Sequence, residues 1–118
     1  MAGPTCAIFG RGALTESRLV DIDKLLASKS TVLVRTRKGK VWDVEIDERP
    51  VHVQIENTED VLWDCEDELL DAGLLPEDAP FQVVLSAGLN SRVDYDMLKV
   101  LSMELAILIG GSATEPTK

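Results

Sequence analysis

Hydrophobic positions change their spacing along the chain, and each change marks an expected element. In "TESRLVDIDKLLAS" (15–28), leucine and isoleucine recur three or four residues apart behind Thr15, a capping residue, which predicts a first helix. Between residues 31 and 56 apolar and polar residues alternate instead, which predicts three strands with one apolar and one polar face. The stretches "RKGK" (37–40) and "DERP" (47–50) predict the turns that join these strands into an antiparallel meander.

Two further strands are expected outside the meander. The apolar run "CAIF" (6–9) is followed by the turn signal "GRG" (10–12) and predicts a strand at the start of the domain. The run "FQVVLSAG" (81–88) follows the loop "LLPEDAP" (74–80) and predicts a strand beyond the meander.

Two further helices are also expected. The stretch "NTEDVLWDCEDELLDAG" (57–73) has Asn57 or Thr58 as its cap, acids in its first turn and a glycine at its end. The last helix begins at Ser91, whose spacing to Asp94 is that of a capping box, and it stops at a pair of glycines.

In chain order the expected elements are β-α-β-β-β-α-β-α. One face of the meander is apolar, and three helices with apolar stripes have to cover it. These features predict an α+β fold: a two-layer sandwich of a mainly antiparallel sheet with the helices on one face, a ferredoxin-like variant. We expect residues 1–111 to form a single domain and the small, polar residues 112–118 to form a disordered tail.

Composition agrees with a globular protein, since 45% of the residues are hydrophobic and 28% are charged. No apolar run approaches the roughly 20 residues that a membrane-spanning helix requires. The first ten residues also lack the basic start of a signal peptide. We therefore expect a cytoplasmic protein without a membrane contact.

The net charge of −9 is distributed unevenly along the chain. Residues 1–40 carry eight bases and three acids, whereas residues 41–78 carry one base and fourteen acids. Nucleic acids and anionic membranes attract basic groups, so the acidic middle excludes them as partners of that surface. A basic protein is the partner that this charge favours, and solubility is the alternative reason for it.

The expected helix 57–73 concentrates these acids around two large apolar residues. On a helical projection Trp63 and Leu70 lie apart from the core face and have acids on both sides. A solvent-facing stripe holds five carboxylates, and no base relieves their repulsion: Asp60, Asp64, Asp67, Glu68 and Asp71. We interpret Trp63 and Leu70 as anchors of a binding surface that the acids steer onto a basic partner. The alternative is that Trp63 packs on the sheet or at a self-contact while the acids solvate an exposed helix.

Other candidate residues carry weaker signals. Glu104 lies among apolar neighbours in the last helix, so it is either a buried catalytic carboxylate or the partner of a base such as Arg35. His52 lies on the polar face of its strand, where the sequence places no nucleophile or acid beside it, and we interpret it as a surface histidine. Cys6 and Cys65 lie on expected core faces and suggest neither a disulfide nor a metal site. No catalytic residue, cofactor or metal is predicted.

The leading hypothesis is a small acidic protein-binding module without enzymatic activity. In size and acidity the chain resembles bacterial immunity proteins, which neutralise cationic nucleases or other toxins, and this resemblance of composition carries no residues across. It implies an inhibitor that masks a basic surface, with imitation of DNA by the carboxylates as a variant. The alternatives are a subunit of a homodimer or larger homo-oligomer with Trp63 at the self-interface, and a small ferredoxin-like ligand-binding protein or enzyme that depends on Glu104 or His52.

Overall fold

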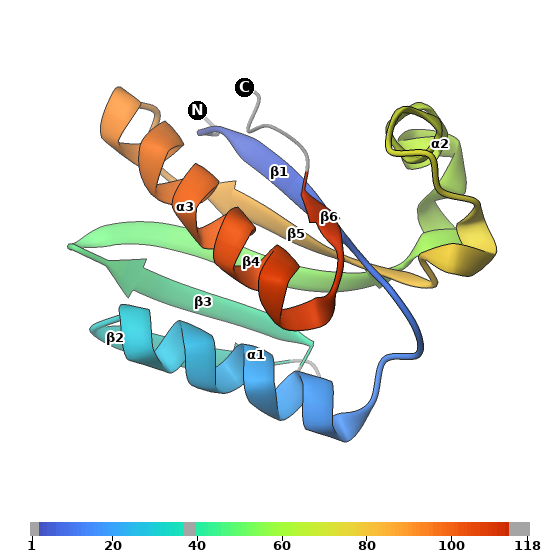
Figure 1. Cartoon of the computed structure of the whole chain (residues 1–118). Helices are drawn as coiled ribbons and strands as arrows, with labels where there is room; N and C mark the ends of the chain where they lie inside the picture. Colours follow the sequence, from blue (N-terminus) through green and yellow to red (C-terminus); the bar gives the residue numbers. More distant parts are fainter. Residues whose placement is uncertain (1–2, 37–39, 114–118) are drawn as a thin grey trace.

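Residues 3–36 and 40–113, the part of the chain that the computed structural model describes, build a six-stranded antiparallel sheet. Within these ranges the side chains of residues 32, 35, 36, 61–65, 76, 112 and 113 lie outside the description. The strand order is β2-β3-β4-β5-β1-β6 (Figure 1). The bounds are β1 Thr5–Gly10, β2 Val32–Thr36, β3 Val41–Ile46, β4 Arg49–Asn57, β5 Phe81–Ala87 and β6 Ser112–Ala113. The mainly antiparallel sheet predicted from the alternating pattern is confirmed.

Helices α1 (Glu16–Lys29) and α3 (Arg92–Ile109) lie side by side over one face of this sheet (Figure 1). Both begin where the sequence predicts a cap. The side chain of Thr15 accepts a hydrogen bond from the amide of Arg18, and Ser91 with Asp94 forms the complete capping box. Helix α3 ends at Gly110, whose positive φ of 65° suits a glycine. Because these helices pack on an antiparallel sheet, the predicted α+β class is confirmed.

The main core fills the space between these two helices and the sheet. Leu19, Ile22 and Leu26 of α1 and Leu98, Leu101 and Leu105 of α3 pack against inward-facing strand residues. Those strand residues alternate along each strand, as a sheet with one covered face requires: Cys6, Ile8, Trp42, Val44, Ile46, Val51, Val53, Ile55, Val83 and Leu85. Trp42 is the largest side chain that is fully buried there.

Helix α2 (Leu62–Asp71) departs from the expectation that all helices cover one face. Its described buried residue, Leu69, packs with Phe9, Leu74 and Ala79 in a separate small cluster. Phe9 follows Ile8 in β1, and successive strand residues point to opposite faces, so this cluster lies away from the main core. Nothing in the strand order confirms the ferredoxin-like arrangement either. The predicted helix 57–73 also begins with a separate 3₁₀ turn, η2 (Thr58–Val61), ahead of α2.

The ordered chain continues past the expected domain end at residue 111. Ser112 and Ala113 form β6 and pair with Phe9 and Ile8 of β1, so these two residues belong to the sheet rather than to a tail. The rest of the predicted tail, residues 114–118, lies outside the described residues. Among those that are described, no helix is both long and apolar enough to cross a membrane.

The turn between β3 and β4 holds two residues in an unfavourable backbone conformation. Ile46 pairs with Arg49, so the loop consists of Asp47 and Glu48 alone, with φ values of 52° and 65°. Two-residue hairpin loops favour such positive φ values because they match the twist of the strands, and they usually contain glycine and asparagine or aspartate. Asp47 tolerates this conformation better than Glu48 does.

We expect Glu48→Gly to raise the free energy of unfolding by about 1 kcal/mol, because glycine adopts a positive φ without steric cost. Urea unfolding of the variant and the parent chain measures the change. Glu45→Gly is the control, since it places glycine in the regular backbone of β3 and should destabilise the protein. A Glu48→Gly variant less stable than the parent would contradict the strain that the φ values indicate.

Candidate functional site

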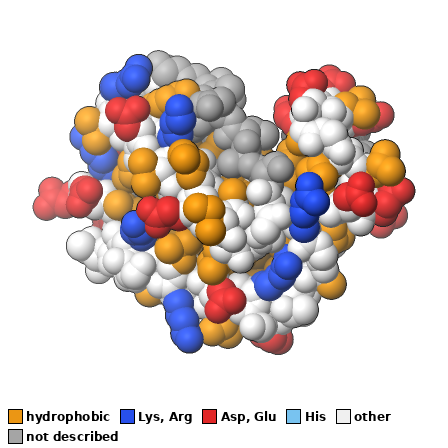
Figure 2. Space-filling view, in the orientation of Figure 1, with side chains coloured by type: hydrophobic (Ala, Val, Ile, Leu, Met, Phe, Trp, Pro, Cys, Tyr) orange, Lys and Arg blue, Asp and Glu red, His pale blue; other side chains and the backbone are white. Residues whose placement is uncertain are grey.

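Between β4 and β5 the chain forms an acidic lobe, which we define as residues 58–79. It contains η2, α2 and the short 3₁₀ turn η3 (Pro76–Asp78), and it stands at one end of the sheet (Figure 1). The sequence has no lysine or arginine between Arg49 and Arg92. Eight carboxylates of the lobe are exposed among its described side chains: Glu59, Asp60, Glu66, Asp67, Glu68, Asp71, Glu77 and Asp78. Figure 2 shows this concentration of acidic side chains on the lobe.

The predicted binding residues fall on this lobe. Leu70 has 64% of its surface exposed. Four of the five predicted carboxylates are exposed as well: Asp60, Asp67, Glu68 and Asp71. The side chains of the other two predicted residues, Trp63 and Asp64, lie outside the described residues. The structure therefore brings an exposed leucine together with four predicted acids, and the role of Trp63 stays a prediction.

No described ion pair involves a carboxylate of the lobe. Asp60 instead accepts a hydrogen bond from the side-chain amide of Asn57 at 3.2 Å, and Asp78 accepts one from the amide of Leu75 at 3.1 Å. Lys40 lines a shallow pocket together with Asp60, and within the described part of the chain the other exposed carboxylates of the lobe have no base paired with them. Such a surface attracts a cationic group from solution and would repel a phosphate.

A second exposed leucine, missed by the sequence reasoning, lies on the same lobe. Helix α2 ends in a Schellman motif: the amide of Leu74 donates to the carbonyl of Leu69 and the amide of Gly73 to that of Leu70. This motif packs Leu69 against Leu74 in the small cluster. The residues that follow each of them, Leu70 and Leu75, are both exposed. The sequence contains one leucine pair before Gly73 (Leu69 and Leu70) and one directly after it (Leu74 and Leu75). This pattern could have predicted that one leucine of each pair is buried and the other exposed.

His52 has the acidic neighbour that the sequence could not place. Its Nδ1 lies 2.7 Å from Oδ1 of Asp43, because these residues are register partners in β4 and β3. Ser86 of β5 is the register partner on the other side, which completes a row of aspartate, histidine and serine. However, Nε2 lies 3.4 Å from the side-chain oxygen of Gln54, and this row does not line the groove described next. The row therefore lacks the histidine–serine contact that nucleophilic catalysis uses.

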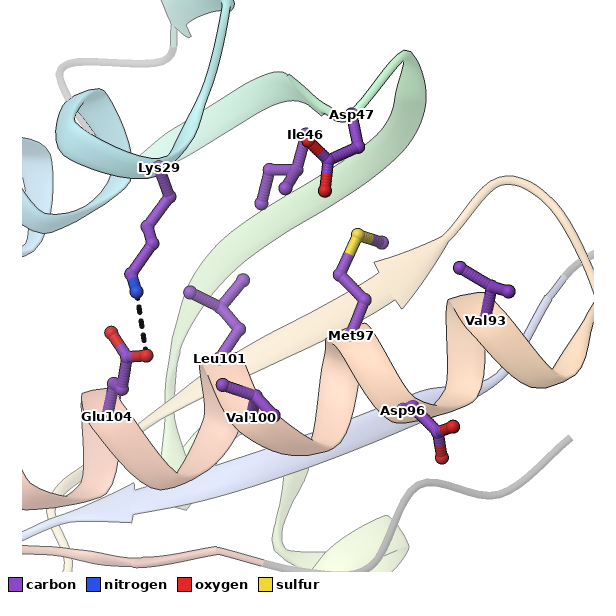
Figure 3. A pocket seen from close by; sticks show the side chains of 9 residues that line it. All are labelled: Lys29, Ile46, Asp47, Val93, Asp96, Met97, Val100, Leu101 and Glu104. Carbon is purple, nitrogen blue, oxygen red and sulfur yellow. Dashed lines mark hydrogen bonds and ion pairs between the residues drawn. The ribbon is translucent and has the colours of Figure 1, made fainter.

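Glu104 lines a groove of about 420 Å³ between α1, α3 and the β3–β4 turn (Figure 3). Its carboxylate forms an ion pair with Nζ of Lys29 at 2.8 Å. Of the two alternatives for Glu104, the pairing with a base is therefore confirmed, and the base is Lys29. The side chain of Arg35, the base suggested from the sequence, lies outside the described residues. Residues of α1, of the β3–β4 turn and of α3 line this groove: Lys29, Ile46, Asp47, Val93, Asp96, Met97, Val100, Leu101 and Glu104.

Cys6 is a core residue, as predicted. Burial raises the pKa of its thiol to about 12, although a hydrogen bond with Ser102 lowers it in part. A thiol with this pKa carries almost no thiolate at neutral pH and is a poor nucleophile or metal ligand. Among the residues with described placement, no three histidine, cysteine or acidic side chains are grouped to hold a metal ion.

No protein-family model, no curated protein and no solved structure matches this chain. Function has to be inferred from the residues themselves. Of the surfaces above, the acidic lobe combines exposed apolar side chains with carboxylates that form no described ion pair, and the groove combines apolar walls with the ion pair of Lys29 and Glu104.

Proposed function

We propose that the protein is a binding module without enzymatic activity, and that its acidic lobe docks on a basic surface of another protein. One observation carries this proposal: Leu70 is 64% exposed amid carboxylates that have no described basic partner. Like charges four residues apart, such as Asp67 and Asp71, cost a helix a few tenths of a kcal/mol each. A helix selected for stability alone would contain bases between them.

The two kinds of side chain on the lobe have different roles in this proposal. Leu70 and Leu75 supply apolar area that becomes buried in the complex, and buried apolar or aromatic anchors contribute most of the binding free energy at protein interfaces. The carboxylates increase the association rate with a cationic partner and exclude anionic ones. Trp63 remains the predicted third anchor.

The partner class that this chemistry fits is a basic protein such as a nuclease or another cationic toxin. A nuclease needs a basic surface to hold the phosphates of its substrate, and the acidic lobe would cover that surface as an immunity-type inhibitor does. In the DNA-mimic variant of this proposal the carboxylates occupy the nucleic-acid site itself. Competition between DNA and the protein for the partner separates the two variants.

Affinity capture with charge-reversed lobes tests the proposal. The tagged parent chain should retain a basic protein from its source cell, whereas a variant with Asp67→Lys, Glu68→Lys and Asp71→Lys should lose it. A matched control reverses Glu16 and Asp21, two exposed acids of α1, and should retain the partner. With the purified partner, Leu70→Ser should weaken binding about tenfold or more, because an anchor is lost. Binding of the parent should also weaken as salt is added.

The proposal is refuted if the variant with the reversed lobe still retains the partner while the variant with the reversed α1 loses it. The binding surface would then lie outside the lobe. Far-ultraviolet circular dichroism and the thermal midpoint of each variant show whether it is folded. Because the substituted side chains are exposed, we expect these variants to keep the fold of the parent.

A ligand-binding protein or enzyme of ferredoxin-like arrangement is the second candidate. The observation in its favour is that Glu104 lines a groove of about 420 Å³, a volume within the range of small-molecule sites. Against catalysis, the Glu104 carboxylate is held by Lys29, and the residues that line the groove include no serine, threonine, cysteine or histidine. Loss of a measurable activity in Glu104→Gln would favour this candidate over the binding module.

A further inference from the structure

Helix α3 presents an apolar stripe to solvent on the side opposite its buried face. Val93, Val100 and Met103 are each more than half exposed, and Ile107 is 84% exposed. Val93, Val100 and Ile107 are seven residues apart, so they lie along one line on the helix. Figure 2 shows hydrophobic side chains gathered over the course of α3. Isolated surface hydrophobic residues need no explanation, but four exposed apolar residues along one side of an 18-residue helix, interrupted there by Asp96, mark an interaction surface.

The two halves of this stripe have complementary shapes. In the N-terminal half, Val93, Met97 and Val100 form one wall of the groove, and Ile46 and Leu101 contribute further apolar surface (Figure 3). In the C-terminal half, Ile107 does not line the groove and stands exposed on the helix. The stripe therefore has a concave part and a projecting part, with Met97 and Ile107 about 15 Å apart along the helix.

We propose that α3 is the interface of a homodimer in which two α3 helices pack antiparallel. A two-fold axis perpendicular to the helix, between Val100 and Met103, places Ile107 of each copy over the groove of the other. Both contacts form at once, which closes the interface and prevents growth into a filament. Two-fold dimers are the commonest oligomers, and the self-complementary stripe meets the requirement that one surface patch serves both copies.

Charge favours a second copy as the occupant of this face. With a net charge of −9, two chains repel each other over most of their surface. Around the stripe, however, two of the three carboxylates that line the groove are paired, Glu104 with Lys29 at 2.8 Å and Asp96 with Arg92 at 3.3 Å, and Asp47 is the third. The acidic lobe lies at the end of the sheet, whereas α3 crosses its covered face (Figure 1). Two copies can therefore meet through α3 and leave both lobes free for a basic partner.

The oligomeric state as a function of protein concentration tests the interface. Sedimentation equilibrium from micromolar to millimolar concentration should show a monomer–dimer equilibrium that persists in high salt, since the contact is apolar. Ile107→Glu should weaken the dimer about tenfold or more, because it would bury a carboxylate in the groove of the partner. Val20→Glu is the matched control: Val20 is an exposed valine of α1 away from the stripe, and its substitution should leave the equilibrium unchanged.

Cross-linking tests the antiparallel geometry separately. In a Cys65→Ser background, Met103→Cys lies next to the two-fold axis and should form an intermolecular disulfide under mild oxidation, whereas Val20→Cys should not. A chain that is monomeric at all concentrations overturns the proposal, and so does a dimer that Ile107→Glu does not weaken. Equal cross-linking at positions 103 and 20 overturns it too. These tests of the dimer are separate from the test of the acidic lobe, because capture of a basic partner by the lobe does not require α3. Failure of one proposal can therefore be distinguished from failure of the other.

Discussion

Replacing Trp42 by alanine should lower the free energy of unfolding by about 3–5 kcal/mol, the largest effect that we expect of any single substitution. Trp42 is fully buried in the main core and is its largest side chain. Its truncation removes a large apolar area from contact with α1 and leaves a cavity that rigid neighbours fill only in part. The indole Nε1 also donates a hydrogen bond to Oδ1 of Asp23 at 2.9 Å, and this bond is lost as well. Urea unfolding at neutral pH measures the loss.

Trp42→Phe is the control that separates volume from hydrogen bonding. It keeps an aromatic ring in the core but removes the donor to Asp23, so the expected loss is about 1–2 kcal/mol. A similar loss for both variants would mean that the hydrogen bond, rather than the buried area, dominates. Trp42→Ala as stable as the parent would contradict the position of the indole in the core.

Replacing Arg49 by methionine should cost about 3 kcal/mol, because it leaves a buried carboxylate without its ionic partner. Asp94 is fully buried, and its Oδ2 accepts hydrogen bonds from Nη1 of Arg49 at 2.9 Å and from the amide of Ser91 at 3.1 Å. Burial alone would raise the pKa of Asp94. Hydrogen bonds from Ser91 and Arg49 and the guanidinium charge outweigh burial and hold this pKa below its ordinary value of 3.8.

The pH dependence of stability reports this lowered pKa. A carboxyl whose pKa is lower in the folded than in the unfolded chain stabilises the fold above its unfolded pKa, here the ordinary value of 3.8. That contribution is lost as the pH falls through the folded pKa. In Arg49→Met the folded pKa of Asp94 rises, so the contribution is smaller and disappears at a higher pH. Urea unfolding between neutral pH and strongly acidic pH follows both chains.

Arg92→Met is the matched control for Arg49→Met. Arg92 forms an ion pair with Asp96 on the exposed face of the same helix, and such surface pairs contribute about 0–1 kcal/mol. For Arg92→Met we expect little change in the free energy of unfolding at neutral pH. We also expect no shift in the pH at which stability is lost on acidification. Equal losses in the two variants would show that burial of Asp94 does not matter for the ion pair.

The features that sequence predicted well are local ones. Alternation identified the strands around Trp42 and Val53, since it depends only on which face each residue covers. Caps at Thr15 and Ser91 were recognisable because a cap bonds to an amide three residues ahead. Exposure of Leu70 followed from helical geometry alone, since the residue lies within the regular part of α2.

The features that sequence missed depend on partners far apart in the chain. No local pattern indicated that Phe9 of β1 packs with Leu69 of α2 in a cluster separate from the main core, which is why all three helices were expected on one face. The pairing of His52 with Asp43 requires the register, and the register depends on the loop Asp47–Glu48. The sequence predicted a turn at 47–50, but without a glycine it did not indicate a two-residue loop with positive φ values, and so it did not fix the register. Lys29 and Glu104 lie 75 residues apart, and only the packing of α1 beside α3 brings them together.

The position of the acidic lobe between two paired strands has a consequence for evolution and engineering. Asn57 ends β4 and Phe81 begins β5, and these two residues are register partners. A short reverse turn could therefore join them directly, as in an ordinary hairpin, once Phe9 beneath the lobe is made polar. We therefore expect that residues 58–80 can be replaced by other segments while α1, α3 and the main core stay unchanged.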